Sequence, residues 1–195
     1  MVRWLDDGRA LYPPFPDHPG PVAGLAVGNV GGRSLIVSGG RLGEIVVRDL
    51  VNGELLFAPV TISYSRILGI ALVELDGRPM IVSCGFGVGG RQPSYIRVWS
   101  MEDGKLQYSI PLSENSRSRA FSVGTLDGQQ TFAISTADGV EVGRLKTGAT
   151  LHAIEIEAHV QSLAIVSGLG VAVGTSHGLL MLTDIRCDSD HQPNE

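Results

Sequence analysis

The sequence has few of the residues that mark a disulfide-rich, zinc-binding or membrane-spanning protein. It contains 2 cysteines among 195 residues, Cys84 and Cys187, which are too few for a disulfide framework. Neither lies in a Cys-x-x-Cys or Cys/His spacing, so we expect no zinc site, no other metal and no cofactor. No run of about 18 apolar residues occurs, which excludes a transmembrane helix.

Charged residues are also scarce. They make up 18% of the chain, and the formal net charge is -5. Lysine and arginine form no cluster, so we expect binding neither to nucleic acid nor to a membrane surface. The N-terminal region carries Asp6, Asp7 and prolines where a signal peptide needs an apolar run. We therefore expect a cytoplasmic protein with reduced thiols.

Glycine, in contrast, is abundant. The chain has 26 glycines and 10 prolines, and 43% of its residues are hydrophobic, which is enough for a packed core. The glycines follow no Gly-X-Y period, so a collagen-like structure is excluded and many tight turns are expected. No apolar stripe with the 3.6-residue period of a helix has a useful length. The composition therefore favours an all-β protein.

A pattern of strands and turns repeats along the chain. Four apolar segments, LIVSG, MIVSC, FAIST and VAVGT, begin at Leu35, Met80, Phe132 and Val171. A turn and a second segment follow each of them: EIVVRD, YIRVWS, GVEVGR and GLLMLT. Alternation of apolar and polar residues with a period of two is typical of β-strands. A further strand precedes each pair, and Asn-Gly or Asp-Gly turns follow the first two.

The repeat has the length of a β-propeller blade. Gly32-Arg33 recurs as Gly77-Arg78, 45 residues later. Asp76-Gly77 recurs as Asp127-Gly128, 51 residues later, with the excess in the Gly-rich stretch 85–95. A unit of four strands and about 45 residues is the period of a propeller blade. We therefore predict an all-β propeller of four-stranded antiparallel blades, with about sixteen strands in four repeats.

In these segments the chain resembles the WD-repeat β-propeller family. IRVWSMEDGKLQ (96–107) and IVVRDLVNGELL (45–56) are similar to the last two strands of a WD-repeat blade, and LDGRPMIVSCG (75–85) is similar to its first hairpin. The resemblance covers residues 1–185. It implies structural roles for four residues that occupy the family's His, Trp and Asp positions, although no repeat carries the full set: His18, Trp99, Asp138 and His159.

The four repeats form one predicted domain over residues 1–185, followed by a disordered tail at 186–195. Their ranges are 22–60, 66–111, 119–155 and 159–185. The last repeat has three strands. Because ALYPPF (10–15) follows Asp7-Gly8 as LLFAP follows Asn52-Gly53, we expect this N-terminal strand to complete the last blade.

An open arc of blades would leave two apolar faces without a neighbour. Each face would measure about 400 Å², and leaving it in water would cost on the order of 10 kcal/mol. Three arrangements avoid this cost: a closed ring of four blades, a head-to-tail homodimer that completes a larger ring, and a partner that supplies the remaining blades.

Two motifs resemble enzyme signatures without their structural context. Gly174-Thr175-Ser176-His177-Gly178 matches the nucleophile elbow of serine hydrolases, which needs a following helix and a downstream acid and histidine. A strand follows instead, and only 17 residues remain after Gly178. GFGVGG (85–90) matches a dinucleotide-binding fingerprint, which needs a helix at its last glycine. Pro93 and a strand follow, so we interpret both motifs as loops.

The predicted binding surface is one rim of the propeller, called here the loop rim. It comprises the connections between repeats and those between the second and third strands of each repeat: 15–21, 58–66, 110–119, 156–159, 39–44, 85–95, 136–139 and 175–178. Arginine and aromatic residues, which are enriched at binding hot spots, occur here. The predicted partner-binding residues are Tyr64, Phe86, Arg91, Tyr95, Arg117 and Arg119.

These features favour a non-catalytic protein–protein interaction module or scaffold. The partner is an unidentified protein that docks on the loop rim, with the 85–95 stretch as a main contact. Two alternatives stay open. One is a propeller-fold hydrolase or lyase, although no paired carboxylates, ligand histidines or credible nucleophile support catalysis, so we expect no enzyme. The other is a non-functional fragment of a longer WD-repeat protein.

Overall fold

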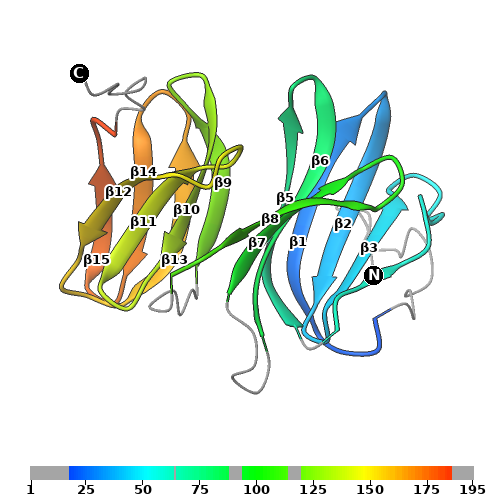
Figure 1. Cartoon of the computed structure of the whole chain (residues 1–195), viewed down its shortest axis with the longest axis horizontal. Helices are drawn as coiled ribbons and strands as arrows, with labels where there is room; N and C mark the ends of the chain where they lie inside the picture. Colours follow the sequence, from blue (N-terminus) through cyan, green and yellow to red (C-terminus); the bar gives the residue numbers. More distant parts are fainter. Residues whose placement is uncertain (1–17, 64, 88–93, 114–119, 186–195) are drawn as a thin grey trace, which may run out of the picture. The chain divides into compact units, whose positions relative to one another are not determined.

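A computed structural model describes residues 18–63, 65–87, 94–113 and 120–185. These residues form 15 β-strands and no helix, as the alternation and the turn residues predict (Figure 1). None of the described residues belongs to a helix that could cross a membrane. The predicted strand 10–15, the tail 186–195 and Cys187 lie outside the described residues, as do the predicted site residues Tyr64, Arg91, Arg117 and Arg119.

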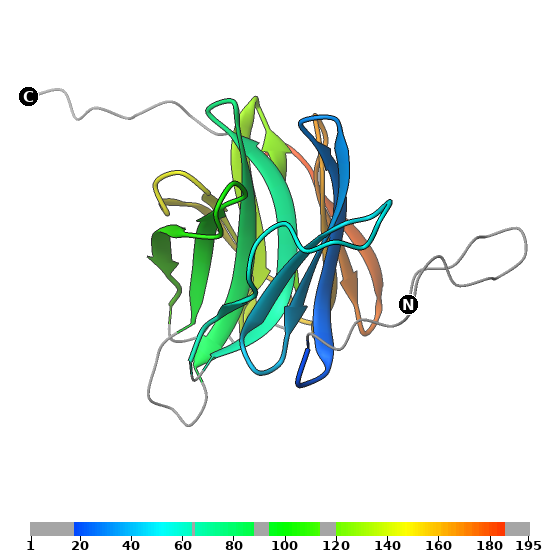
Figure 2. The same cartoon turned by 90° about the vertical axis from the view of Figure 1, so that its right-hand side faces the viewer.

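The strands form four sheets, and in each sheet consecutive strands are neighbours (Figures 1 and 2). The first sheet contains β1 (Val22–Val30), β2 (Arg33–Gly40), β3 (Glu44–Asp49) and β4 (Val60–Thr61). The second contains β5 (Ser65–Leu75), β6 (Arg78–Gly87), β7 (Tyr95–Ser100) and β8 (Leu106–Pro111).

The third and fourth sheets follow in the same order along the chain. The third contains β9 (Phe121–Leu126), β10 (Gln129–Ser135), β11 (Gly139–Arg144) and β12 (Thr150–Glu155). The fourth contains β13 (Val160–Val166), β14 (Gly170–Thr175) and β15 (Gly178–Leu182). Within the described residues, the fourth sheet therefore has three strands, whereas each of the other sheets has four.

The hairpins that open the second and third sheets depend on a two-residue turn with positive φ. Asp76 and Gly77 have φ values of 51° and 72°, and Asp127 and Gly128 have values of 47° and 74°. Aspartate tolerates this region better than most residues, and glycine adopts it at no steric cost. The Asp-Gly pairs therefore fix where β5 turns into β6 and where β9 turns into β10.

The chain divides into two compact units, residues 1–109 (unit 1) and 110–195 (unit 2), with the boundary inside β8. Unit 1 buries a core between the first two sheets, in which Leu35 and Val37 of β2 pack with Ile67 of β5 and Ile81 of β6. The two sheets approach so closely that a Cβ added at Gly24 would lie 3.1 Å from the backbone nitrogen of Ile70.

Unit 2 buries a separate core between the third and fourth sheets. Val140 and Val142 of β11 pack there with Val171 and Val173 of β14. The sheets also share a hydrogen bond, in which the backbone N–H of Ile165 donates to the Ser122 hydroxyl at 3.0 Å. Each unit thus contains two sheets and its own hydrophobic core.

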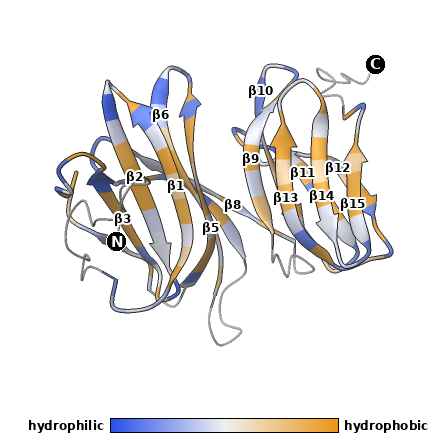
Figure 3. Cartoon of the chain, turned by 180° about the vertical axis from the view of Figure 1, so that it is seen from behind, coloured by the Kyte–Doolittle hydropathy of each residue, from blue (hydrophilic) through white to orange (hydrophobic). Residues whose placement is uncertain are grey.

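The outer edge of the fourth sheet carries exposed apolar side chains. In β15, Leu179 is 78% exposed and Met181 is 42% exposed, and Figure 3 shows that hydrophobic residues occur along this strand. Within the described residues β15 pairs only with β14. The strand therefore offers unpaired backbone groups and apolar side chains together.

Matching the four segments LIVSG, MIVSC, FAIST and VAVGT letter by letter would place Ser38, Ser83, Ser135 and Gly174 at equivalent positions. The strand pairing differs from this alignment by one residue in unit 2. Ser38 pairs with Val46, and Ser83 pairs with Arg97, at equivalent positions of the first two sheets. The corresponding pairs in unit 2 are Ile134 with Glu141 and Val173 with Leu180. FAIST and VAVGT are therefore shifted by one position relative to LIVSG and MIVSC.

Candidate functional site

Trp99 and Ser83 form a buried hydrogen bond in unit 1. The indole N–H of Trp99 donates to the Ser83 hydroxyl at 2.9 Å, and the two residues are only 6% and 2% exposed. A buried indole needs such a partner, because an unpaired N–H in the core costs free energy. Trp99 also packs in the unit 1 core, so it joins β6 and β7 through both contacts.

His18 binds the serine at the equivalent position of the first sheet. His18 Nε2 and the Ser38 hydroxyl lie 2.7 Å apart. The imidazole thus connects the segment before β1 to β2. Ser38 and Ser83 are held by different side chains, a histidine in one sheet and a tryptophan in the other.

A buried polar cluster surrounds Gly40 beside this hydrogen bond. The Glu44 carboxylate is in the interior, where Oε2 accepts a hydrogen bond from the Leu42 backbone N–H at 3.3 Å. Glu44 Oε1 and His18 Nδ1 are buried and have no hydrogen-bond partner among the residues that the structure describes. A Cβ on Gly40 would collide with the Glu44 carboxylate and lie 3.0 Å from His18 Nδ1. The absence of a side chain at residue 40 therefore gives both polar groups their space.

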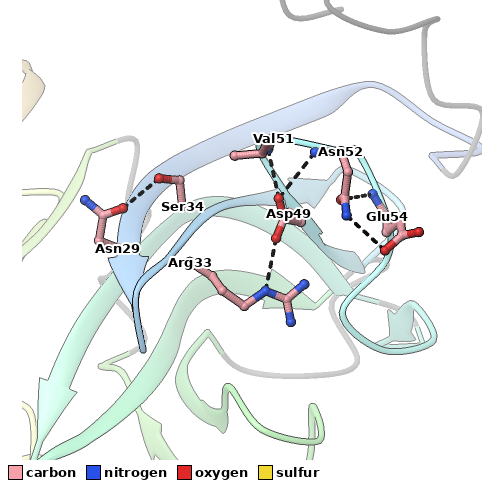
Figure 4. Close-up of polar contacts among 7 residues, drawn as sticks. All are labelled: Asn29, Arg33, Ser34, Asp49, Val51, Asn52 and Glu54. Atoms are coloured by element: carbon pink, nitrogen blue, oxygen red, sulfur yellow. Dashed lines mark hydrogen bonds and ion pairs between the residues drawn. The ribbon is translucent and has the colours of Figure 1, made fainter.

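A second polar cluster joins the ends of β2 and β3 (Figure 4). Asp49 Oδ2 accepts a hydrogen bond from Arg33 Nε at 3.0 Å, and Asp49 Oδ1 accepts one from the Val51 backbone N–H at 2.8 Å. The Val51 N–H first, and then the Arg33 guanidinium, hold the pKa of Asp49 below its ordinary value. No sequence motif singles out this residue, which precedes the Asn52-Gly53 turn.

Phe86 and Tyr95, the two predicted partner-binding residues within the described chain, lie at the same end of the second sheet. Tyr95 pairs with Gly85, so the side chains of Tyr95 and Phe86 point to opposite faces of the sheet. Both are half-buried. The structure therefore places them close along the strands without joining them in one cluster.

Tyr95 has a different neighbour that the composition of the loops did not reveal. The Arg97 guanidinium lies over the Tyr95 ring, 4.9 Å from its centroid, in a cation–π contact. Arg97 Nη1 also donates to the Ser65 hydroxyl at 3.4 Å. Burial lowers the pKa of the Arg97 guanidinium. The signal in the sequence was the i, i+2 spacing, which places both residues on one face of β7.

Asp138 and His159, predicted as structural residues, lie at neighbouring connections of unit 2. The Asp138 carbonyl accepts a hydrogen bond from the Ile156 N–H at 2.9 Å, and the His159 carbonyl accepts one from the Ser176 N–H at 3.0 Å. Both contacts use backbone oxygens. A cavity of ≈ 400 Å³ opens beside them, with His159 in its lining.

Within the described residues, no group of three or more His, Cys, Asp and Glu side chains could hold a metal ion. Ser176 and His177 of the elbow-like motif lie in the short turn between β14 and β15. Gly85–Gly87 of the fingerprint-like motif belong to β6.

The comparison with solved structures identifies the fold. The crystal structure of the computationally designed Ika4 protein matches with a TM-score of 0.61 and 20% sequence identity, over 85% of this chain and 92% of that chain. The chain is a four-bladed β-propeller. Each of the four sheets is one blade, and this result confirms the fold class predicted from the repeat.

A natural propeller protein shows the same likeness. The crystal structure of BamB from Moraxella catarrhalis matches with a TM-score of 0.54 and 18% identity, over 82% of this chain and 49% of that chain. The propeller described here therefore spans about half the length of that chain. No protein-family model and no curated protein sequence matches this chain. At these identities the likeness concerns the fold alone.

Proposed function

We propose that this propeller is a non-catalytic protein-interaction module of the WD-repeat type, which binds a partner protein at the loop rim. The propeller fold is compatible with such a scaffold. The observation that carries the proposal is the stack of Tyr95 on Arg97 at the rim of the second blade. Tyrosine and arginine dominate binding hot spots, and a stacked pair loses little side-chain entropy when a partner docks.

The length of the neighbouring connection supports the same surface. The second and third strands of the second blade are separated by residues 88–94, whereas 41–43, 136–138 and 176–177 suffice in the other blades. Blade packing therefore does not require the additional residues. Extra residues in a connection cost ordering entropy, so a role in binding is a reason to keep them.

The test is alanine substitution of the proposed anchors. A partner is first identified by affinity capture with the full chain, and its affinity is then measured for Phe86→Ala, Arg91→Ala and Tyr95→Ala. Each anchor substitution should weaken binding by about 1–2 kcal/mol, or about 5- to 30-fold in Kd, with little change in melting temperature.

Arg78→Ala is the matched control, because Arg78 is exposed at the opposite end of the same blade. It should leave the affinity for the partner unchanged. Full affinity in the triple variant would overturn the assignment of this surface.

A further inference from the structure

The cavity in the rim of unit 2 has walls that the backbone holds in place. Besides the bond between the His159 carbonyl and the Ser176 N–H, Thr136 N–H donates to the Gly139 carbonyl at 2.8 Å. The Gly139 N–H donates a hydrogen bond to Thr136 Oγ1 at 3.0 Å. The two bonds between Thr136 and Gly139 close the β10–β11 turn, and the Ser176 N–H holds the β14–β15 turn to His159. The bond from the Ile156 N–H to the Asp138 carbonyl joins the β10–β11 turn to the connection that precedes β13.

Both polar and apolar side chains line this cavity. The side chains of His159, Gln161 and Ser176 line it and engage no hydrogen-bond partner within the described residues. The lining contains no aspartate, glutamate, lysine or arginine. Because the lining offers no carboxylate, ammonium or guanidinium group to pair with a charged ligand, it favours an uncharged one.

The other lining residues are small, and the hydroxyls of the two polar ones, Ser135 and Thr136, are hydrogen-bonded to backbone groups. Ala137, Ala158 and Val160 contribute methyl groups to the walls. A volume of ≈ 400 Å³ lies in the range of small-ligand sites, which pair an apolar surface with a few polar groups. A phenol ring fits this combination, because it has an apolar body and one hydrogen-bonding tip.

We propose that this cavity binds an uncharged phenol, with the ring against Ala137 and Ala158 and the hydroxyl at His159, Gln161 and Ser176. The source that suits a protein-interaction module is a tyrosine side chain of the partner, and in that form the proposal rests on the proposed function. Asp138 and Glu157 adjoin the lining in sequence and are exposed. Their charges repel a phosphate, so phosphorylation of the tyrosine prevents binding.

The direct experiment uses small probes on the full chain. Backbone amide resonances are followed by NMR while N-acetyl-L-tyrosinamide is added, and p-cresol is titrated separately as a free phenol. Saturable shifts confined to residues 136–139, 158–161 and 176 are expected with both. N-acetyl-L-phenylalaninamide, which lacks the hydroxyl, should bind about fivefold more weakly. The phosphotyrosine amide should give no saturable shifts.

Two variants locate the site. Ala158→Trp fills the cavity and should abolish the tyrosinamide shifts, whereas Gln161→Leu keeps the volume and should weaken binding of the phenol more than that of the phenylalanine probe. Leu169→Trp is the control, because it lies in the β13–β14 turn at the opposite end of the blade. An unchanged amide spectrum elsewhere shows that each variant is folded.

The outcomes separate this proposal from the proposed function. The phenol site is overturned if neither phenol gives saturable shifts. It is also overturned if the phenylalanine and phosphotyrosine probes bind as tightly as the tyrosine amide. If Ala158→Trp retains full affinity for the partner while the Phe86, Arg91 and Tyr95 variants lose it, the partner's tyrosine is excluded and the interaction module stands. If the phenols bind and no protein partner is captured, the site stands with a free phenol as its ligand.

Discussion

The indole N–H of Trp99 and the hydroxyl of Ser83 are joined by a hydrogen bond of 2.9 Å inside unit 1. In the adjacent blade, the equivalent serine, Ser38, lies 2.7 Å from His18 Nε2 instead. One serine position thus stabilises two blades through different partners. In the first blade the bond fixes the chain before β1, and in the second it ties two strands of the same sheet together.

Removal of the indole should show how strongly the second blade depends on this bond. Trp99→Phe leaves the Ser83 hydroxyl buried without its donor, which typically costs about 1–3 kcal/mol of unfolding free energy. Ser83→Ala removes the acceptor instead. Urea unfolding of both single variants and of the double variant gives a double-mutant cycle. We expect a favourable coupling of about 1 kcal/mol between the two side chains, and strictly additive losses would contradict it.

Gly40→Ala should destabilise the first blade. The added Cβ collides with the Glu44 carboxylate and crowds His18, and overpacking of this kind costs about 1–3 kcal/mol. Chemical denaturation measures the loss. In a Glu44→Ala background the carboxylate is absent, so the same substitution at residue 40 should cost clearly less. Equal costs in both backgrounds would show that the carboxylate is not the obstacle.

The stability of unit 1 should depend on the ionisation of Asp49. Its pKa in the folded chain is lowered from 3.8 by the Val51 N–H and by Arg33. Between the lowered pKa and 3.8, the folded state therefore binds fewer protons than the unfolded state. The contribution of Asp49 to the free energy of unfolding is fully present above pH 3.8, and it is lost as the pH falls through the lowered pKa. Urea unfolding at several pH values should show that Asp49→Asn destabilises near neutrality, with a difference that shrinks in acid.

The outer edge of the last blade should become exposed when the N-terminal segment is removed. The sequence predicts that residues 10–15 supply a strand beside β15, which carries Leu179 and Met181 exposed in the described part of the chain. Deletion of residues 1–16 should then cause association, because an unpaired apolar edge recruits other strands. Size-exclusion chromatography with light scattering measures the molar mass.

A charged residue on the same edge is the control for this truncation. Leu179→Lys in the truncated chain should reduce association, since lysine protects exposed edges. A truncated chain that stays monomeric and keeps its full stability would show that residues 10–15 do not complete the blade. A full-length dimer would instead favour the larger ring formed by two copies.

The blades could be predicted from the sequence because their turns carry strong local signals. Asp76-Gly77 and Asp127-Gly128 adopt the positive φ values that their residue types favour. The register of β10 was missed, since matching the letters of FAIST with those of MIVSC equated Ser135 with Ser83. Counting instead from the Asp-Gly turn places Ile134 at this position, as the strand pairing does. Turn geometry sets register in a hairpin, so the turn is the better reference.

The arrangement of the predicted partner-binding residues could not be read from the sequence, for a physical reason. Residue type suggested Phe86 and Tyr95 together, but the face on which each side chain lies depends on strand pairing, and the pairing separates them. The partner of Tyr95 is Arg97, two residues along the same strand. The cavity beside His159 requires three connections to meet, the start of β13 and the turns after β10 and β14. These connections are far apart in the sequence, so no local sequence pattern predicts that they lie together.

The presence of a separate hydrophobic core in each unit has a consequence for cooperativity. A chain whose two halves each bury their own apolar cluster can lose one half while the other stays folded, so it need not behave as a two-state system. Amide hydrogen exchange would then show two groups of protection factors that change at the 109/110 boundary. Heat denaturation would give a calorimetric enthalpy larger than the van't Hoff enthalpy.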